Sequence, residues 1–445
     1  AKPGVVADLT WYIPDTDKAR SAQALRELGS RWVRLHVQWR EAEPQPGVFD
    51  EWWMSEYGRA LSAARAAGQK VIVMLSEAPT WARVAQGSAP RDPMLFAGFL
   101  ERFAARFRGR VDAYEIWNEP NIARFWGPRP DPAAYTELLG AAHGALRRAD
   151  PHARVVFGGL SGNDWRFLEA AYSAGAKGRF DVLAAHPYPY CGASGPGRSR
   201  RSGGRITADS FTGYRELRAS MLARGDAKPI WFTEFGWNTS TVKCNPGSGQ
   251  WQGGVSEERQ ALYLRRAFKL VERDRYVKVA IWYNLRDNWW QRGADEPEAR
   301  FGLLRADYSR KPAFYAFKAY ARPKLRPRAT TVTVALAPRP AAGRGVRIEG
   351  AVRGADAGRV RIAVKRWAGK GWRLWQRRSA RLDSEGRYRV PLKPLGPGRY
   401  RARARYLGTD LHRPSASRWR SWRVAPTRPA SAGDGALGAR ARPGS

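Results

Sequence analysis

The sequence predicts an α/β protein, a (β/α)₈ TIM barrel followed by an antiparallel β-sandwich, and three observations lead to this fold class. Within about the first 320 residues, eight short apolar runs alternate with longer amphipathic stretches. No glycine-rich phosphate loop follows the first run, as it would in a doubly wound nucleotide-binding sheet. Beyond that point, short alternating runs are separated by Gly and Pro. Eight strand–helix units in this length are typical of a closed barrel.

The eight apolar runs have the length and the branched or aromatic composition of β-strands. An open sheet would show the same alternation with fewer strands, so the count favours the barrel. We expect the strands at residues 5–12, 32–39, 70–77, 113–119, 155–161, 181–188, 229–237 and 279–285.

The stretches between these runs repeat apolar residues at three- and four-residue spacing, which is the period of an α-helix. Examples are "DKARSAQALRELG", "MLFAGFLERFAARF" and "EERQALYLRRAFKLVERD". Asp or Ser opens several of them, as a helix N-cap does, and Gly closes others. Each predicted strand is therefore followed by a predicted helix.

From "RPKLRPRATT" onward the pattern changes to runs such as "GVRIEGAV", "RVRIAVKRW" and "YRARARYLG". Period-two alternation between Gly and Pro turns indicates an antiparallel β-sandwich of about 100 residues. The pattern resembles the immunoglobulin-like modules appended to secreted bacterial enzymes. We expect the barrel at residues 1–322, an immunoglobulin-like β-sandwich at 328–424, and a disordered tail at 425–445.

Positive charge is concentrated in the C-terminal part. Residues 322–445 hold 31 of the 78 basic and 6 of the 40 acidic residues, a net charge of +25 out of +38. This excess favours an anionic partner, such as an acidic polysaccharide or a cell-envelope polymer. The alternative is a general enrichment in arginine that only keeps the sandwich soluble. Nucleic acid would explain the charge but not the residues on the barrel rim, so we expect no nucleic-acid partner, and a monomer.

The chain has no run of about 18 apolar residues, so we expect no membrane span. It begins "AKPGVV", without a basic-then-apolar leader, so it is cytosolic or has lost a secretion signal. Cys191 and Cys244 lie in "YCGASGPG" and "VKCNPGSG". A bridge between them would favour an oxidising compartment, and two buried thiols are the alternative. We expect the bridge, and a secreted or envelope-associated protein.

In a barrel of this kind, chemistry sits at the C-terminal ends of the strands. The fourth predicted strand, "YEIWNEPN", ends in Asn118 and Glu119, where a proline stops the ladder. The seventh, "PIWFTEFGW", carries Glu234. The other residues that we expect on this rim are Arg34, His186, Tyr188 and Trp282.

Two carboxylates without a metal cluster suit glycosidic bond cleavage. One carboxyl group protonates the leaving oxygen, and the other attacks the anomeric carbon or activates water. The five histidines are scattered and lack metal-ligand spacing, which makes a metal hydrolase a poor fit. The chain also lacks the Gly-x-Ser-x-Gly elbow of serine esterases.

"IWNEPN" and "WFTEFGW" together resemble the catalytic pair of the clan A glycoside hydrolases. Families 39 and 5 are the most similar, including bacterial exopolysaccharide endoglycosidases of the family 39 type. The resemblance covers about residues 5–320. Family 5 enzymes usually carry a histidine near the end of the third strand, and "MLSEAPTWA" has none. This departure favours a family 39-like or unclassified clan A enzyme.

The resemblance implies a retaining β-glycosidase that hydrolyses O-glycosidic bonds of a poly- or oligosaccharide by double displacement, with no cofactor and no metal. Glu119 would be the general acid/base, kept protonated by burial and by the neighbouring carboxylate. Glu234 would be the nucleophile, held ionised by Arg34 and Tyr188.

The remaining rim residues would bind the sugar. Asn118 would hydrogen-bond the 2-hydroxyl group, and His186 would orient the two carboxylates. Trp282 would form the floor under the reacting sugar, because indole faces pack on sugar C–H surfaces. Further candidates for substrate contact are Glu77, Trp126 and Trp289.

One alternative stays open at this point: a carbohydrate-binding or envelope-anchoring protein that keeps the barrel without turnover. Two carboxylates at strand ends favour the enzyme, because a binding site has no need to hold two acids close together. The sequence names neither the sugar nor the linkage.

Overall fold

The computed structural model describes residues 1–10, 14–85, 87–189, 194–243, 253–287, 296–321, 329–337, 342–343, 345–355, 357–383, 385–409 and 412–426. The chain divides into two compact units, Ala1–Lys324 and Leu325–Ser445. Among the residues described, no helix is both long enough and apolar enough to cross a lipid bilayer.

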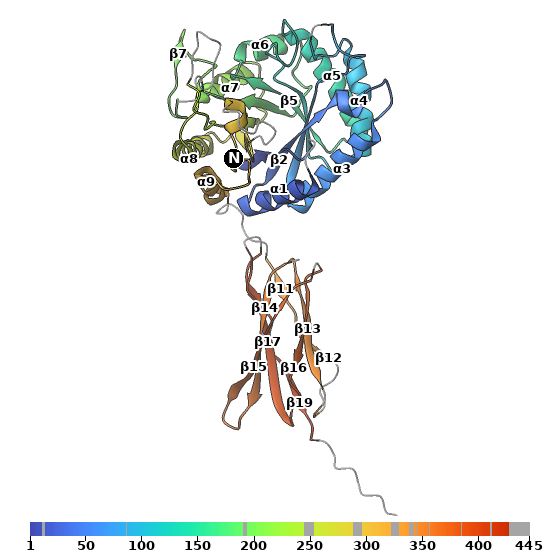
Figure 1. Ribbon diagram of the computed structural model, residues 1–445, viewed down its shortest axis with the longest axis vertical. Helices are drawn as coiled ribbons and strands as arrows, with labels where there is room; N and C mark the ends of the chain where they lie inside the picture. Colours follow the sequence, from blue (N-terminus) through green and yellow to red (C-terminus); the bar gives the residue numbers. More distant parts are fainter. Residues whose placement is uncertain are drawn as a thin grey trace, which may run out of the picture. The chain divides into compact units, whose positions relative to one another are not determined.

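The N-terminal unit is a closed barrel of eight parallel strands, which confirms the predicted fold class (Figure 1). Around the barrel the strands follow the order β1-β10-β9-β6-β5-β4-β3-β2. Their bounds are β1 Lys2–Val6, β2 Trp32–Gln38, β3 Lys70–Ser76, β4 Ala113–Asn118, β5 Arg154–Ser161, β6 Val182–His186, β9 Ile230–Phe235 and β10 Val277–Trp282.

Every predicted strand overlaps an observed one, but the first begins earlier than predicted. Pro3 and Gly4 are weak strand formers, so the sequence gives no strand signal before Val5. In the structure a Cβ on Gly4 would lie 2.2 Å from the side chain of Ile281 in β10. Glycine is therefore needed in β1 because the neighbouring strands pack so closely there.

The helices surround the barrel (Figure 1). Asp50, Asp92, Asp131, Asp164 and Ser256 cap five of them by accepting backbone N–H groups, as the Asp and Ser openings indicated. The α-helices described in this unit are α1 Asp15–Leu28, α2 Trp39–Ala42, α3 Glu51–Ala66, α4 Pro93–Arg106, α5 Pro132–Ala149, α6 Trp165–Ser173, α7 Tyr214–Ala223, α8 Glu257–Arg273 and α9 Pro312–Ala321. A short hairpin, β7 Arg201–Ser202 and β8 Arg205–Ile206, follows β6.

Two apolar layers hold the barrel together. One fills its interior, and the other lies between strands and helices. Alternation along each strand assigns residues to the two layers. In β10, for example, Ile281 belongs to the interior layer, whereas Ala280 and Trp282 belong to the outer one. The same alternation decides which aromatic side chain at the end of β10 reaches the rim of the barrel.

The C-terminal unit consists of two antiparallel sheets packed over one apolar core, which is a β-sandwich. One sheet contains β11 Thr331–Val332, β12 Ala335–Ala337, β13 Val346–Arg353 and β16 Arg387–Leu392. The other contains β14 Arg359–Trp367, β15 Trp372–Arg381, β17 Gly398–Tyr406, β18 Ser415–Ala416 and β19 Arg420–Val424. The immunoglobulin-like assignment stays a prediction.

Candidate active site

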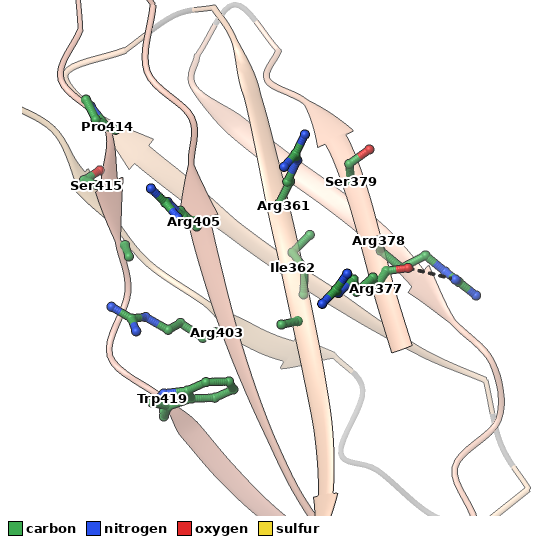
Figure 2. A pocket seen from close by; sticks show the side chains of 12 residues that line it. Arg361, Ile362, Arg377, Arg378, Ser379, Arg403, Arg405, Pro414, Ser415 and Trp419 are labelled. Carbon is green, nitrogen blue, oxygen red and sulfur yellow. Dashed lines mark hydrogen bonds between the residues drawn. The ribbon is translucent and has the colours of Figure 1, made fainter. Parts of the chain in front are cut away.

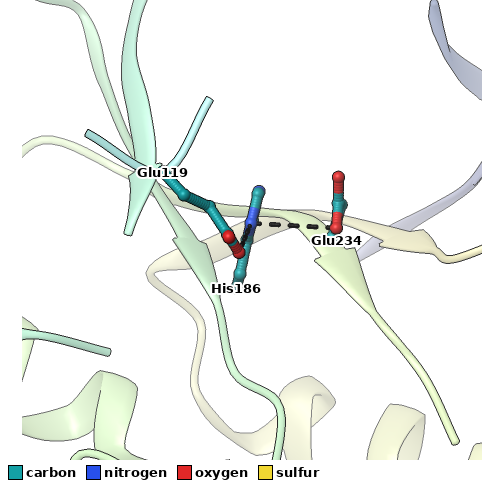
Figure 3. Close-up of side chains that lie close together, drawn as sticks. All are labelled: Glu119, His186 and Glu234. Atoms are coloured by element: carbon teal, nitrogen blue, oxygen red, sulfur yellow. Dashed lines mark hydrogen bonds and ion pairs between the residues drawn. The ribbon is translucent and has the colours of Figure 1, made fainter. Parts of the chain in front are cut away.

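Two glutamates from separate barrel strands meet at the C-terminal rim of the barrel. Glu119 follows β4 directly, and Glu234 is the penultimate residue of β9. One carboxylate oxygen of each lies within 4.8 Å of the other and of a ring nitrogen of His186 (Figure 3). The fold therefore brings these three residues together, as predicted.

His186, the last residue of β6, shares a proton with Glu119. Its Nδ1 lies 2.8 Å from Oε1 of Glu119, and its Nε2 lies 3.1 Å from the Thr233 hydroxyl. Thr233 already donates its own proton to Glu115, at 2.8 Å, so it must accept from Nε2–H. Nδ1 and the Glu119 oxygen therefore need a proton between them, because two bare acceptors would repel one another at this distance. The pair thus holds one transferable proton.

The imidazole fits because β5 carries a glycine beside it. A Cβ on Gly159 would lie 2.1 Å from Nε2 of His186. Burial lowers the pKa of His186, but the charge of Glu234 and the hydrogen bond and charge of Glu119 outweigh this, so that its pKa is raised. A raised pKa favours retention of the proton by the His186–Glu119 pair.

Glu234 is held in its ionised form by three neighbours. Nη1 of Arg34 donates to Oε1 at 2.6 Å, and the Tyr188 hydroxyl donates to Oε2 at 3.0 Å. Burial raises the pKa of Glu234, but the charges of His186 and Arg34 and the hydrogen bonds from Tyr188 and Arg34 leave it below its ordinary value. Burial and the charge of Glu234 raise the pKa of Tyr188, so the phenol stays a donor.

Asn118 is oriented by the same arginine. Nη2 of Arg34 donates to Oδ1 of Asn118 at 2.9 Å. Because a guanidinium can only donate, the amide oxygen must face it, and the amide nitrogen is left to donate elsewhere. Asn118 also lines the cavity described below. Its amide nitrogen is therefore placed to bind a substrate hydroxyl.

Consecutive residues of a regular strand point to opposite faces, yet Asn118 and Glu119 both line the cavity. The backbone explains how. Trp117 and Glu119 adopt left-handed conformations, with φ of 73° and 42°. Such a conformation costs about 1–3 kcal/mol per residue and is kept where the surroundings hold it. Here the buried Trp117 indole donates to the Phe125 carbonyl at 2.7 Å.

A cavity of about 640 Å³ opens over the two glutamates. Aromatic walls come from Phe125, Tyr188, Tyr283 and Phe301, and its rim carries Arg124 and Glu298, paired at 2.5 Å. This volume lies within the range of small-molecule sites. The cavity can therefore take sugar units with the two carboxylates beneath them.

The spacing of Glu119, His186 and Glu234 would also suit a metal ion, but the side chains around them disfavour one. Arg34 places a fixed positive charge 2.6 Å from Glu234. Nδ1 of His186 is engaged with Glu119. A cation would have to displace both interactions and would face the guanidinium at close range. The set of side chains fits proton transfer and nucleophilic attack better than metal binding.

Two predicted substrate contacts are wrong. Trp282 is fully buried in the outer layer, where its indole donates to the Phe301 carbonyl at 3.1 Å. Alternation turns it away from the rim, and the next residue, Tyr283, lines the cavity instead. Trp126 is also buried, with its ring packed edge-on against Trp117 and Tyr135. Both tryptophans pack the fold.

Glu77 follows β3 at the same rim, but it is not among the described residues that line the cavity. Its carboxylate accepts from Gln38 at 3.1 Å and from Arg40 at 3.0 Å. Trp289, Cys191 and Cys244 lie outside the described residues.

Sequence reasoning missed one central residue. Glu115 is fully buried inside β4 and accepts from Arg34 Nε (2.7 Å), Gly159 N (3.0 Å) and Thr233 Oγ1 (2.8 Å). It therefore connects the groups that orient Glu234 and His186. An acid in the middle of an apolar strand was the available signal, because a buried charge requires a partner.

The cellulase family model, glycosyl hydrolase family 5, matches residues 3–286, well over half of the chain. The chain belongs to this family. It is an O-glycoside hydrolase of the retaining clan A, and the predicted resemblance to families 5 and 39 is confirmed. The preference for family 39 is not, since the model that matches is that of family 5. No curated protein matches the sequence closely enough to be compared.

Solved structures show the same fold at low sequence identity. A family 39 glycoside hydrolase from Bacteroides cellulosilyticus WH2 is 21% identical, with a TM-score of 0.59 over 87% of this chain and 80% of that one. A monomeric β-xylosidase from Caulobacter crescentus CB15 is 18% identical, with a TM-score of 0.53 over 88% and 94%. A GH5_18 enzyme from Streptomyces cattleya in complex with GlcNAc is 20% identical, with a TM-score of 0.55 over 77% and 83%.

Proposed function

We propose that this enzyme hydrolyses the glycosidic bonds of a poly- or oligosaccharide by double displacement, with Glu119 as acid/base and Glu234 as nucleophile. The observation that carries the proposal is the approach of the two carboxylates to within 4.8 Å around His186. Retaining enzymes hold their carboxyl groups about 5–5.5 Å apart, whereas inverting enzymes leave about 6.5–9.5 Å for a water molecule. The short separation supports attack by Glu234 itself.

The geometry supports this assignment of the two roles. Glu234 is ionised and lacks a transferable proton, because both of its oxygens accept from donors. It attacks the anomeric carbon, while the Glu119–His186 pair delivers its proton to the leaving oxygen. In the second step Glu119 accepts a proton from a water molecule as that water attacks the anomeric carbon, which breaks the bond to Glu234 and releases its carboxylate. Asn118 donates to the sugar, and Tyr283 replaces Trp282 as the aromatic contact.

Removal of the His186 charge should shift the pH profile. An attacking carboxylate must be ionised, so activity is present above the pKa of Glu234 and is lost as the pH falls through it. The charge of His186 is the first of the groups that lower this pKa. In His186→Gln the acid limb of kcat/KM should therefore move to higher pH. A pH profile on a small aryl glycoside measures this, and an unchanged acid limb would refute the proposed coupling.

The cavity favours a neutral sugar at the cleavage point. Its described lining carries four carboxylates and one arginine, Arg124, which is already paired with Glu298. An acidic sugar would find no unpaired cation in this lining and would lie beside the ionised Glu234. We therefore propose that any acidic groups of the polymer lie away from the reacting sugar. Product analysis on neutral and acidic plant and bacterial polysaccharides tests this, and release of a uronic acid at the new reducing end would contradict it.

We also propose that the enzyme is secreted or envelope-associated and that Cys191 is bridged to Cys244. The support is the order of the sequence, in which Cys191 comes after β6 and Cys244 after β9, two neighbouring barrel strands. A bridge would constrain the two segments of chain that follow these strands. Titration of the native protein without reductant should find no free thiol, and two reactive thiols would refute the bridge.

A further inference from the structure

The outward face of one sheet of the C-terminal unit carries rows of arginine. In β17, Tyr400, Ala402, Ala404 and Tyr406 are buried, whereas Arg403 and Arg405 between them are exposed. The neighbouring β14 repeats the pattern, with Val360 and Ile362 inside and Arg361 outside. Alternation along both strands thus sends apolar residues to the core and cations to solvent.

The strand register gathers these cations. Arg361 pairs with Arg405, and Ala363 lies opposite Arg403 on one side and Arg377 on the other. Residues directly opposite in an antiparallel pair are about 4.5–5.5 Å apart. Small residues leave room between the arginines, and the face is hollowed into a groove of about 980 Å³ (Figure 2). We call Arg361, Arg377, Arg403 and Arg405 the arginine groove.

Acidic side chains do not compensate this charge in the described part of the unit. The ion pairs there join Arg347 and Arg389 to Glu349, and Arg387 to Asp383 and Glu385. All of these lie on β13, on β16 or in the turn before β16. Like charges this close destabilise a sheet, and an anion between them would remove the repulsion.

An aromatic side chain closes one end of the groove. Trp419 lines it, and the guanidinium of Arg401 lies 4.4 Å from the Trp419 ring centre and 4.5 Å from that of Trp372. Guanidinium groups bind carboxylate and sulfate in bidentate geometry, and ring faces pack on sugars. The groove therefore offers contacts for both parts of an acidic sugar chain.

We propose that the arginine groove is a binding site for an acidic polysaccharide, separate from the catalytic cavity. This rests on the proposed function in one respect: the barrel acts on carbohydrate, so a glycan is the polyanion that the attached unit meets. The two sites then divide the polymer between them. The groove holds carboxylate- or sulfate-bearing segments, and the cavity cleaves at a neutral sugar.

Affinity electrophoresis of the full chain in gels containing polygalacturonate, dextran sulfate or neutral dextran tests the proposal. Arg361→Gln/Arg403→Gln/Arg405→Gln should weaken retardation by the acidic polymers roughly tenfold, as expected for three exposed ion pairs. Arg361→Gln/Arg405→Gln, which keeps the 3.1 Å bond from Arg403 to the Ser417 carbonyl, should give a smaller loss in the same direction. Added salt should weaken binding of the unmodified chain.

The matched control removes the same charge from the other sheet, as Arg347→Gln/Arg387→Gln/Arg389→Gln, and should retain binding. Equal losses in the two triple variants would show that net charge alone attracts the polymers and would overturn the site. Stronger competition by duplex DNA than by either polysaccharide at equal charge would assign the groove to nucleic acid instead. Hydrolysis of a small aryl glycoside, followed in parallel, reports on the catalytic proposal independently, because the groove variants leave the cavity intact.

Discussion

Glu234→Gly should lower hydrolysis by roughly 10⁴-fold or more, and added azide should restore part of the rate. The variant lacks the carboxylate that attacks the anomeric carbon, while Arg34, Tyr188 and His186 remain to shape the space that it leaves. Azide fits that space and attacks from the same face. The product should then be a glycosyl azide of inverted configuration, identified by mass spectrometry and NMR.

Glu119→Gln should lower the hydrolysis rate by a similar factor on substrates with poor leaving groups. The loss should be much smaller on an activated aryl glycoside, because its leaving group departs without a proton. Glu298→Gln is the matched control, because Glu298 lies on the cavity rim, paired with Arg124. It should remain within a few-fold of the unmodified enzyme. Near-normal rates for both the Glu234 and the Glu119 variant on a good substrate would show that the catalytic groups lie elsewhere.

Glu115→Leu should destabilise the barrel by about 3–5 kcal/mol, because removal of one partner from a buried ion pair leaves the other charge uncompensated. Arg34 is 3% exposed, and Glu115 accepts its Nε at 2.7 Å. Thr233 and the Gly159 amide would lose their acceptor as well. Urea denaturation followed by tryptophan fluorescence measures the change.

Glu51→Gln serves as the control for that substitution. Glu51 pairs with Arg106 at 2.6 Å, but the pair is exposed and screened by solvent, so its loss should leave the denaturation midpoint unchanged. Equal midpoints for Glu115→Leu and the unmodified enzyme would contradict the role given to Glu115. Glu115→Gln, which keeps the shape, should fall between the two and should lower kcat more than it raises KM.

The barrel could be predicted because its signals are local. Apolar runs and helical spacing are read directly from neighbouring residues, and the Asn118–Glu119–Pro120 turn breaks the strand pattern visibly. The positions of Glu119 and Glu234 followed from one rule about strand ends. Arg34, His186 and Tyr188 followed from the same rule, and the structure places all three against the two glutamates.

Contacts that depend on side-chain direction could not be predicted in the same way. Trp282 and Tyr283 are adjacent, and a shift of one residue in the strand exchanges the core face for the rim. Trp126 looked like a loop residue, but the turn after β4 returns it to the core beside Trp117. The partners of Glu115 lie on β2, β5 and β9, which only the closed barrel brings together.

The arginine groove, too, could be predicted only in part from the sequence. The alternation in "YRARARY" predicts a strand with one basic face. The positions of Arg361 opposite Arg405, and of Arg377 opposite Ala363, depend on the pairing of β14 with its two neighbours, which no local pattern specifies. Composition therefore indicated an anionic partner, whereas the position of a binding face required the register.

In this mechanism Glu234 itself attacks the sugar, and the configuration of the first product shows whether it does. Proton NMR of the anomeric region, recorded within seconds to minutes of adding enzyme to a β-linked oligosaccharide substrate, distinguishes the two outcomes before mutarotation. Two carboxylates within 4.8 Å predict that the β-anomer appears first and the α-anomer only later. An α-anomer as the first product would mean direct attack by water, and double displacement at this site would be wrong.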